Sequence, residues 1–224
     1  GRMFDLAPWR AAHRPGPVLP LPLARDGCRQ DSAWQPRRIL VVRLDSIGDV
    51  LLSEPAIAAL RERHPQAVLD VAAGSLGKAV LEGHPAIDSF IVYDAPWHAA
   101  WRGSRVSWPR EVSRFWRALR DVRRRRYDLV VELRGDFRDI IFALLTRSGV
   151  MIGCGWRGGG SLLDYDVPFD TRVHQVSFAL AIARGAGADP TPRPPHLVTS
   201  ESAQVEVASW LSGCENVTFI GMHL

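Results

Sequence analysis

The sequence predicts an α/β fold, a Rossmann-like parallel sheet with helices on both faces. Short apolar, β-branched segments alternate at least five times with segments whose apolar residues recur at helical spacing. This alternation is typical of a mostly parallel sheet that is covered on both sides. The chain has 224 residues, of which 46% are hydrophobic and 23% charged, an ordinary globular composition. Disorder of the whole chain, collagen and low-complexity fibres are therefore excluded.

The first elements are a tail, a strand and a helix. Residues 1–36 contain six prolines and no sustained period, so we expect an extended or disordered tail over 1–37. The apolar run at 39–42 is too short and too β-branched for a helix and predicts a buried strand. Residues 49–63 predict a helix, in which Pro55 should cause a kink or a restart.

The same alternation continues to the end of the chain. Further strands are expected at 68–72, 90–93, 128–133, 150–153 and 217–220, and a short one is considered at Leu197 and Val198. Helices are expected at 76–82, 110–124, 136–146, 174–187 and 201–211, with a Trp-rich loop at 94–108. Because the chain stops directly after the last strand, we expect a fragment of a longer protein, with one domain at 38–212 and the start of another at 213–224.

The charge is unevenly distributed. The net charge is +4, and the segment from Arg102 to Arg126 holds ten arginines against Glu111 and Asp121. Such a basic stripe favours a phosphate, an anionic membrane surface or nucleic acid as its neighbour, and a solvated helix face is equally consistent with it. No helix-turn-helix, RNP or zinc pattern accompanies the arginines, so no nucleic-acid partner is expected. The three cysteines are far apart, which predicts neither a disulfide framework nor a zinc site.

Candidate site residues follow the first strand, because ligands of open α/β sheets bind at the carboxyl ends of the strands. This loop contains Arg43, Asp45, Ser46, Gly48 and Asp49. Gly48 would allow a tight turn or a close approach to a ligand, and Asp49 falls at the helix start, where it could act simply as a helix cap. Neither the dinucleotide fingerprint nor the P-loop is present.

A second group of candidates follows the strand at 128–133. Arg134, Gly135 and Arg138 lie there, and two arginines at this edge suit a phosphate or a carboxylate. Arg138 could instead form an ion pair with Asp139 or Glu132. Residues 153–160, which include Arg157, contain five glycines and predict either a plain turn or a loop that is mobile or closely approached.

The segment ILVVRLDSIGDVLLSEPAIAALRERHP, residues 39–65, resembles the start of glycosyltransferase family nine, the ADP-heptose:lipopolysaccharide heptosyltransferases. Residues 128–139, 150–156 and 174–187 resemble later stretches of that family in the same order. The resemblance implies a GT-B architecture, in which the N-terminal domain binds the acceptor and the C-terminal domain binds the nucleotide-sugar. This chain would be the acceptor half and inactive alone.

The resemblance further implies inverting transfer, without metal or cofactor, of a heptose or related sugar. The donor would be a nucleotide-sugar such as ADP-heptose, and the acceptor a lipid-linked glycan such as the lipopolysaccharide inner core. Asp49 matches the catalytic base, and Arg43 could hold an acceptor anion or orient Asp49. The expected substrate-binding residues are Arg43, Asp45, Ser46, Gly48, Arg134, Gly135, Arg138 and Arg157. The location would be cytoplasmic, with the basic stripe placing the protein on the inner face of the bacterial inner membrane.

A different class of function also fits these residues. A non-catalytic α/β module that binds an acidic glycan or an anionic lipid would need the arginines but no base at Asp49. The module predicts that the natural reading frame stops directly after Leu224, whereas the enzyme predicts about 120–150 further residues in which strands and helices alternate.

Overall fold

The computed structural model describes residues 34–97, 107–147, 149–168 and 172–212. Several features expected from the sequence lie outside this part of the chain. They are the tail before residue 34, the strand at 217–220, most of the Trp-rich loop, Arg102, Arg105, Cys28 and Cys214.

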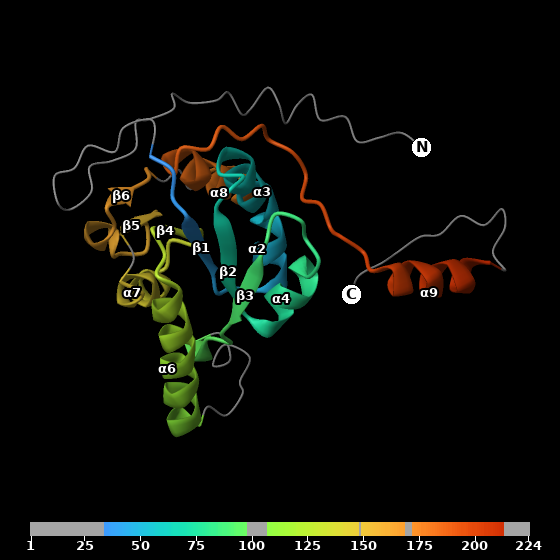
Figure 1. Ribbon diagram of the computed structural model, residues 1–224, viewed down its shortest axis with the longest axis horizontal. Helices are drawn as coiled ribbons and strands as arrows, with labels where there is room; N and C mark the ends of the chain where they lie inside the picture. Colours follow the sequence, from blue (N-terminus) through green and yellow to red (C-terminus); the bar gives the residue numbers. More distant parts are fainter. Residues whose placement is uncertain (1–33, 98–106, 148, 169–171, 213–224) are drawn as a thin grey trace.

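Six parallel strands form one sheet, in the order β3-β2-β1-β4-β5-β6. The strands are β1 Arg38–Arg43, β2 Val68–Ala73, β3 Ser89–Val92, β4 Leu129–Glu132, β5 Val150–Gly153 and β6 Tyr165–Asp166. The chain builds outward from β1 to β3 and then returns to place β4 beside β1 (Figure 1). This is the doubly wound order of dinucleotide-binding folds, so the predicted Rossmann-like α/β class is confirmed.

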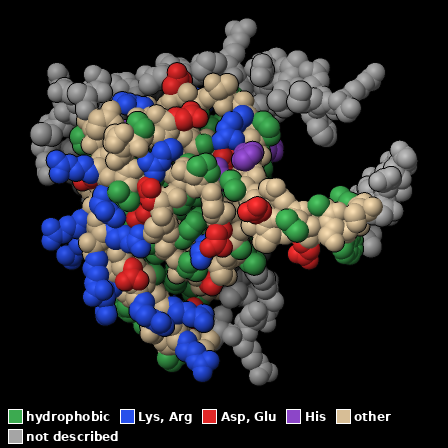
Figure 2. Space-filling view, turned by 45° about the vertical axis from the view of Figure 1, so that its right-hand side comes forward, with side chains coloured by type: hydrophobic (Ala, Val, Ile, Leu, Met, Phe, Trp, Pro, Cys, Tyr) green, Lys and Arg blue, Asp and Glu red, His purple; other side chains and the backbone are tan. Residues whose placement is uncertain are grey.

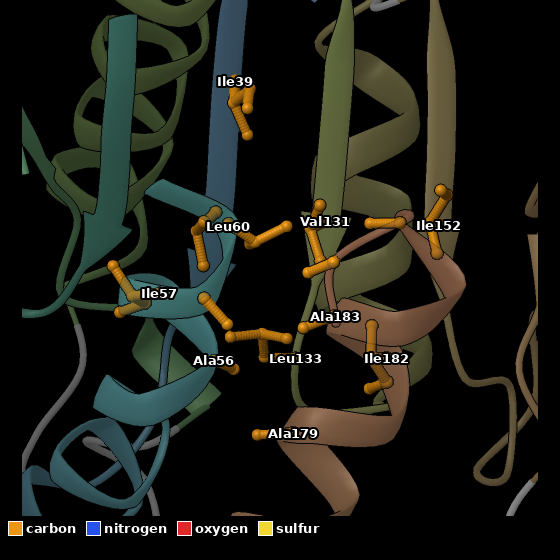
Figure 3. Close-up of a cluster of buried hydrophobic side chains, with 14 of the residues drawn as sticks. Ile39, Ala56, Ile57, Leu60, Val131, Leu133, Ile152, Ala179, Ile182 and Ala183 are labelled. Atoms are coloured by element: carbon orange, nitrogen blue, oxygen red, sulfur yellow. The ribbon is translucent and has the colours of Figure 1, made fainter. Parts of the chain in front are cut away.

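Helices cover both faces of the sheet, and the two faces bury different side chains of the same strand. Ile39 and Val41 pack in a core with α2 Ile47–Leu52, α3 Glu54–Arg63, α4 Ser75–Leu81 and α8 Gln175–Gly185. Figure 3 shows part of this core, with side chains of α3 and α8 meeting those of β1, β4 and β5. Leu40 and Val42 pack on the opposite face with α6 Trp108–Arg125 and α7 Phe137–Leu145. The alternation follows from the two-residue period of a strand.

The helix expected at 49–63 restarts in its middle. Ser53 ends α2, where its backbone N–H donates to the Val50 carbonyl oxygen at 3.1 Å, and α3 begins at the next residue. Pro55 lies in the first turn of α3, where its missing N–H has no intrahelical partner to lose. The predicted restart at Pro55 is confirmed.

Other expectations differ from the structure. Leu197 and Val198 form no strand. They lie in residues 188–200, which contain no helix or strand. The two-residue strand β6 and the short 3-10 turn η1 Gly160–Leu162 were not expected. Helix α9 Glu201–Leu211 has the predicted bounds, buries no residue and lies apart from the sheet in Figure 1. None of the described helices is long and apolar enough to cross a membrane.

Glu54 fastens the segment after α8 to the body of the domain. Its fully buried carboxylate accepts hydrogen bonds from Arg193 at 2.6 and 3.0 Å and from the His196 backbone N–H at 2.9 Å. The His84 ring nitrogen Nε2 lies 2.9 Å from the same carboxylate. A buried carboxylate is stable only with such partners, so this contact fixes the course of residues 193–196 over α3.

Candidate active site

A cavity of about 540 Å³ opens at the carboxyl ends of β1 and β4. It lies where the strand order reverses, the position at which open parallel sheets bind ligands. The loops after β1, β3, β4 and β5 and the start of α8 contribute to its wall. The lining residues are Arg43, Asp45, Ser46, Asp49, Trp97, Arg134, Arg138, Trp156, Arg157 and Gln175. The structure therefore brings together seven of the residues predicted from the sequence.

Asp49 occupies the first turn of α2, and Ser46 caps that helix. The Ser46 hydroxyl donates to Asp49 Oδ2 at 2.7 Å, and its oxygen accepts from the Asp49 backbone N–H at 3.5 Å. The expectation that Asp49 itself could be the cap is wrong, because Asp49 is the third helical residue. Its side chain is 34% exposed, so the carboxylate is oriented by Ser46 and open to the cavity.

Arg43 lies behind Asp49 and is 2% exposed. Its guanidinium donates to the Leu133 carbonyl oxygen and lies 3.5 Å from both Asp49 Oδ1 and Asp45 Oδ2. Asp45 also pairs with Arg134, whose Nε is 3.0 Å from Asp45 Oδ2. Of the two roles considered for Arg43, binding an acceptor anion and orienting Asp49, these contacts favour the second.

Three arginines converge on Asp136, which caps α7. Arg138 donates to both Asp136 oxygens at 2.8 Å, and Arg134 and Arg157 lie 3.8 and 3.7 Å from Oδ2. The hydrogen bonds from Arg138 hold the pKa of Asp136 well below its usual value. The suggested pairing of Arg138 with Asp139 or Glu132 is wrong, since the neighbouring cap residue offers both oxygens to the planar guanidinium.

Two further carboxyl groups lie buried beneath the cavity. Glu132 accepts the backbone N–H groups of Arg134 and Gly135, both at 2.8 Å, and Asp139 Oδ2 lies 3.6 Å from Arg134. Burial raises the pKa of Glu132 to about 8 and that of Asp139 to about 7. Both buried groups therefore hold their protons more readily than a carboxyl group in water does.

Gly135 is required by the geometry of the loop after β4, and Gly48 is not required in the same way. Gly135 has φ of +76°, and a Cβ there would overlap the Trp156 ring and lie 2.7 Å from the Cys154 carbonyl oxygen. Gly48 lies in α2 without a positive φ, and a Cβ there would meet no atom. The expected tight turn at Gly48 is therefore absent. The space next to its Cα, in the first turn of α2, is open.

Gly135→Ala is expected to destabilise the domain by about 1–3 kcal/mol, because alanine combines a strained positive φ with a collision against Trp156. Gly48→Ala provides the matched control. It should change stability by about 0.5 kcal/mol or less, or increase it, because alanine favours a helix more than glycine does. Urea denaturation of both variants measures the difference, and equal midpoints would contradict the role assigned to Gly135.

The sequence interpretation missed Trp97, Trp156 and Gln175. The Arg157 guanidinium lies 4.6 Å from the Trp156 ring centroid, and that of Arg138 lies 5.6 Å from the Trp97 ring. The tryptophans thus form an aromatic wall beside the arginines. His174 caps α8 by accepting from the Val176 N–H at 3.2 Å, which is a structural role. Within the described ranges, no three His, Cys, Asp or Glu side chains are grouped to hold a metal ion.

Comparison with solved structures gives strong matches. A family 9 glycosyl transferase from Veillonella parvula superposes with a TM-score of 0.63 at 18% identity, over 82% of this chain and 51% of its own. ADP-heptose lipopolysaccharide heptosyltransferase II from E. coli gives 0.58 at 23% identity, over 78% and 50%. An E. coli heptosyltransferase solved with ADP-2-deoxy-2-fluoro heptose gives 0.58 at 20% identity, over 70% and 51%.

No protein-family model and no curated protein sequence matches the chain. The chain spans about half the length of the solved structures it resembles. Identities of 18–23% establish likeness of fold. The expected resemblance to glycosyltransferase family nine is thereby confirmed for the fold, and this chain has the architecture of about one half of a heptosyltransferase structure.

Proposed function

We propose that the chain is the acceptor-binding half of an inverting glycosyltransferase. The enzyme would transfer a heptose or a related sugar from a nucleotide-sugar, ADP-heptose, to an acidic glycan of the lipopolysaccharide inner core. The observation that carries the proposal is the carboxylate of Asp49, which Ser46 and Arg43 orient at the edge of an arginine-lined cavity. The solved neighbours with bound ADP or an ADP-heptose analogue support the choice of donor.

In this proposal Asp49 is the general base. The acceptor hydroxyl donates a hydrogen bond to the carboxylate and attacks the anomeric carbon of the donor sugar. As the new carbon–oxygen bond forms, the bond to the nucleotide diphosphate breaks and the hydroxyl proton passes to Asp49. Ser46 and Arg43 position the carboxylate, Ser46 through its 2.7 Å hydrogen bond to Oδ2 and Arg43 through its 3.5 Å contact with Oδ1.

Arg157 is the arginine best placed to contact an acidic acceptor. Its side chain is 50% exposed, and its ion pair with Asp136 is long at 3.7 Å, so it can bind a carboxylate or phosphate without losing a close internal partner. Trp156 offers an adjacent flat apolar surface to a sugar ring. A lipid-linked acceptor of this kind would place the enzyme at the inner face of the bacterial cytoplasmic membrane.

Arg157→Ala is expected to weaken binding of deacylated inner-core oligosaccharide about tenfold or more, because one charge-assisted hydrogen bond contributes about 1.5–3 kcal/mol. Isothermal titration calorimetry of this chain measures the effect, with neutral dextran as the comparison ligand. Arg37→Ala is the matched control and should leave binding unchanged. Arg37 is exposed and directly precedes β1, at the amino ends of the strands, whereas the cavity lies at their carboxyl ends. Equal affinity for dextran and for the acidic oligosaccharide would overturn the proposed acceptor.

A further inference from the structure

Helix α6 presents a basic outer face. It packs on the sheet through Ala118, Leu119 and Val122, and the rest of its surface carries exposed arginines. They are Arg110, Arg114, Arg117, Arg120 and Arg124. Within the described residues only Arg114 of these five forms an ion pair, with Glu111 at 3.0 Å. Figure 2 shows Lys and Arg side chains gathered densely along one side of the body and its lower end.

An apolar stripe runs along one flank of this basic face. Trp108, Val112 and Trp116 recur at four-residue spacing and are 68%, 51% and 52% exposed. Trp116 also lines a surface hollow of about 490 Å³ together with Leu119, Arg120, Arg123, Arg124 and Arg126. Large exposed aromatic side chains beside arginines are the pattern of helices that lie in a membrane interface, where cations meet headgroups and rings reach the acyl boundary.

The stripe lies at the same end of the molecule as the cavity. Helix α6 begins after β3 has ended at the carboxyl edge of the sheet, and Figure 1 shows the lower part of α6 extending past that edge. Phe115 of α6 contacts Tyr93 edge-on, with ring centroids 6.0 Å apart, and Tyr93 contacts the cavity residue Trp97 in the same way at 6.0 Å. Packed aromatic rings therefore connect the helix to the wall of the cavity.

We propose that α6 docks this chain on an anionic phospholipid bilayer. The arginines of its outer face contact the headgroups, and Trp108 and Trp116 enter the interface. The cavity is then held close to the membrane surface, where a lipid-linked acceptor would present its glycan, and this last consequence alone rests on the proposed function. A bilayer fits better than nucleic acid, because these side chains lie along one projecting helix. Among the described residues, the hollow beside them is lined by one aromatic ring, that of Trp116, whereas successive bases stack on a row of rings.

Co-sedimentation of the 224-residue chain with phosphatidylcholine vesicles, with and without phosphatidylglycerol, tests the proposal. The vesicles contain no glycan, so the result is independent of acceptor recognition. We expect binding only to the anionic vesicles, weakening as salt rises. Arg120→Gln combined with Arg124→Gln should weaken it tenfold or more, because each arginine near such a surface contributes about 1 kcal/mol. Lys78→Gln should have no effect, since Lys78 belongs to α4, which packs on the face of the sheet opposite to α6.

Quenching of tryptophan fluorescence by brominated lipids tests the aromatic stripe. Trp108→Ala combined with Trp116→Ala should remove most of the quenching, and Trp210→Ala on the exposed helix α9 should preserve it. Circular dichroism and oligosaccharide binding at the cavity verify that the variants are folded. Unchanged vesicle binding by both double variants would overturn the proposal. So would binding to RNA that depends on Arg120 and Arg124 while vesicle binding does not. A wild-type chain that binds vesicles but not the oligosaccharide would instead count against the proposed function.

Discussion

Asp49→Asn is expected to reduce sugar transfer by about 10²–10⁴-fold, the range that a positioned general base contributes. An amide cannot accept the proton of the attacking hydroxyl. Its carbonyl oxygen can still accept the hydrogen bond from Ser46, so the first turn of α2 should keep its structure. The measurement is the initial rate of heptose transfer from ADP-heptose to inner-core acceptor, in a two-domain enzyme that carries this chain.

Ser46→Ala separates the chemical role of Asp49 from its positioning. This variant retains the base but loses the 2.7 Å hydrogen bond that orients it, so we expect a smaller loss of rate than for Asp49→Asn. Acceptor affinity should be similar in both variants, because neither removes an arginine of the cavity. Near-wild-type transfer by Asp49→Asn would contradict its assignment as base.

Glu54→Ala is expected to have the largest effect on stability, a loss of about 3–5 kcal/mol in the free energy of unfolding at neutral pH. The substitution removes the carboxylate partner of two side chains. They are the buried His84 and the half-buried Arg193. Glu62→Ala, at an exposed position of the same helix, is the matched control and should change stability by about 0.5 kcal/mol or less. Equal urea midpoints for the two variants would contradict the structural role of Glu54.

The contribution of Glu54 should depend on pH in a defined direction. Burial by itself raises the pKa of Glu54, but hydrogen bonds from His84 and Arg193 outweigh it and lower the pKa from 4.5 to about 2. A carboxyl group whose pKa is lower in the folded state stabilises the fold above its unfolded pKa and loses that effect as the pH falls through the folded value. The stability difference between wild type and Glu54→Gln should therefore shrink as the pH falls from about 4.5 towards 2.

The fold could be predicted from the sequence because its four central strands, β2, β1, β4 and β5, are buried on both faces. Such strands are nearly continuous apolar runs, and the helices between them have a clear apolar period. The failures have physical causes. Strand β6 has only two residues, so it leaves no periodic signal. Leu197 and Val198 have the residue types of a strand, but no neighbouring strand pairs with them among the described residues.

The candidate site was predictable to the extent that strand topology determines it. Parallel strands end at one edge, so the loops that carry Asp49 and Arg134 could be expected to meet. Trp97 and Gln175 could not be expected in the same way, because they reach the cavity only through the packing of α7 and α8 on opposite faces of the sheet. Local geometry also decided the choice of Asp136 as partner of Arg138 and of Ser46 as helix cap.

The attachment at Glu54 gives the segment after α8 a mechanical connection to the cavity. Arg193 holds Glu54, Glu54 directly follows Ser53, and the Ser53 hydroxyl donates to the Asp49 carbonyl oxygen at 2.9 Å. No loop separates α2 from α3, so little slack exists along this path. Residues 193–196 are therefore joined, through Arg193, Glu54 and Ser53 in turn, to the turn of helix that carries Asp49.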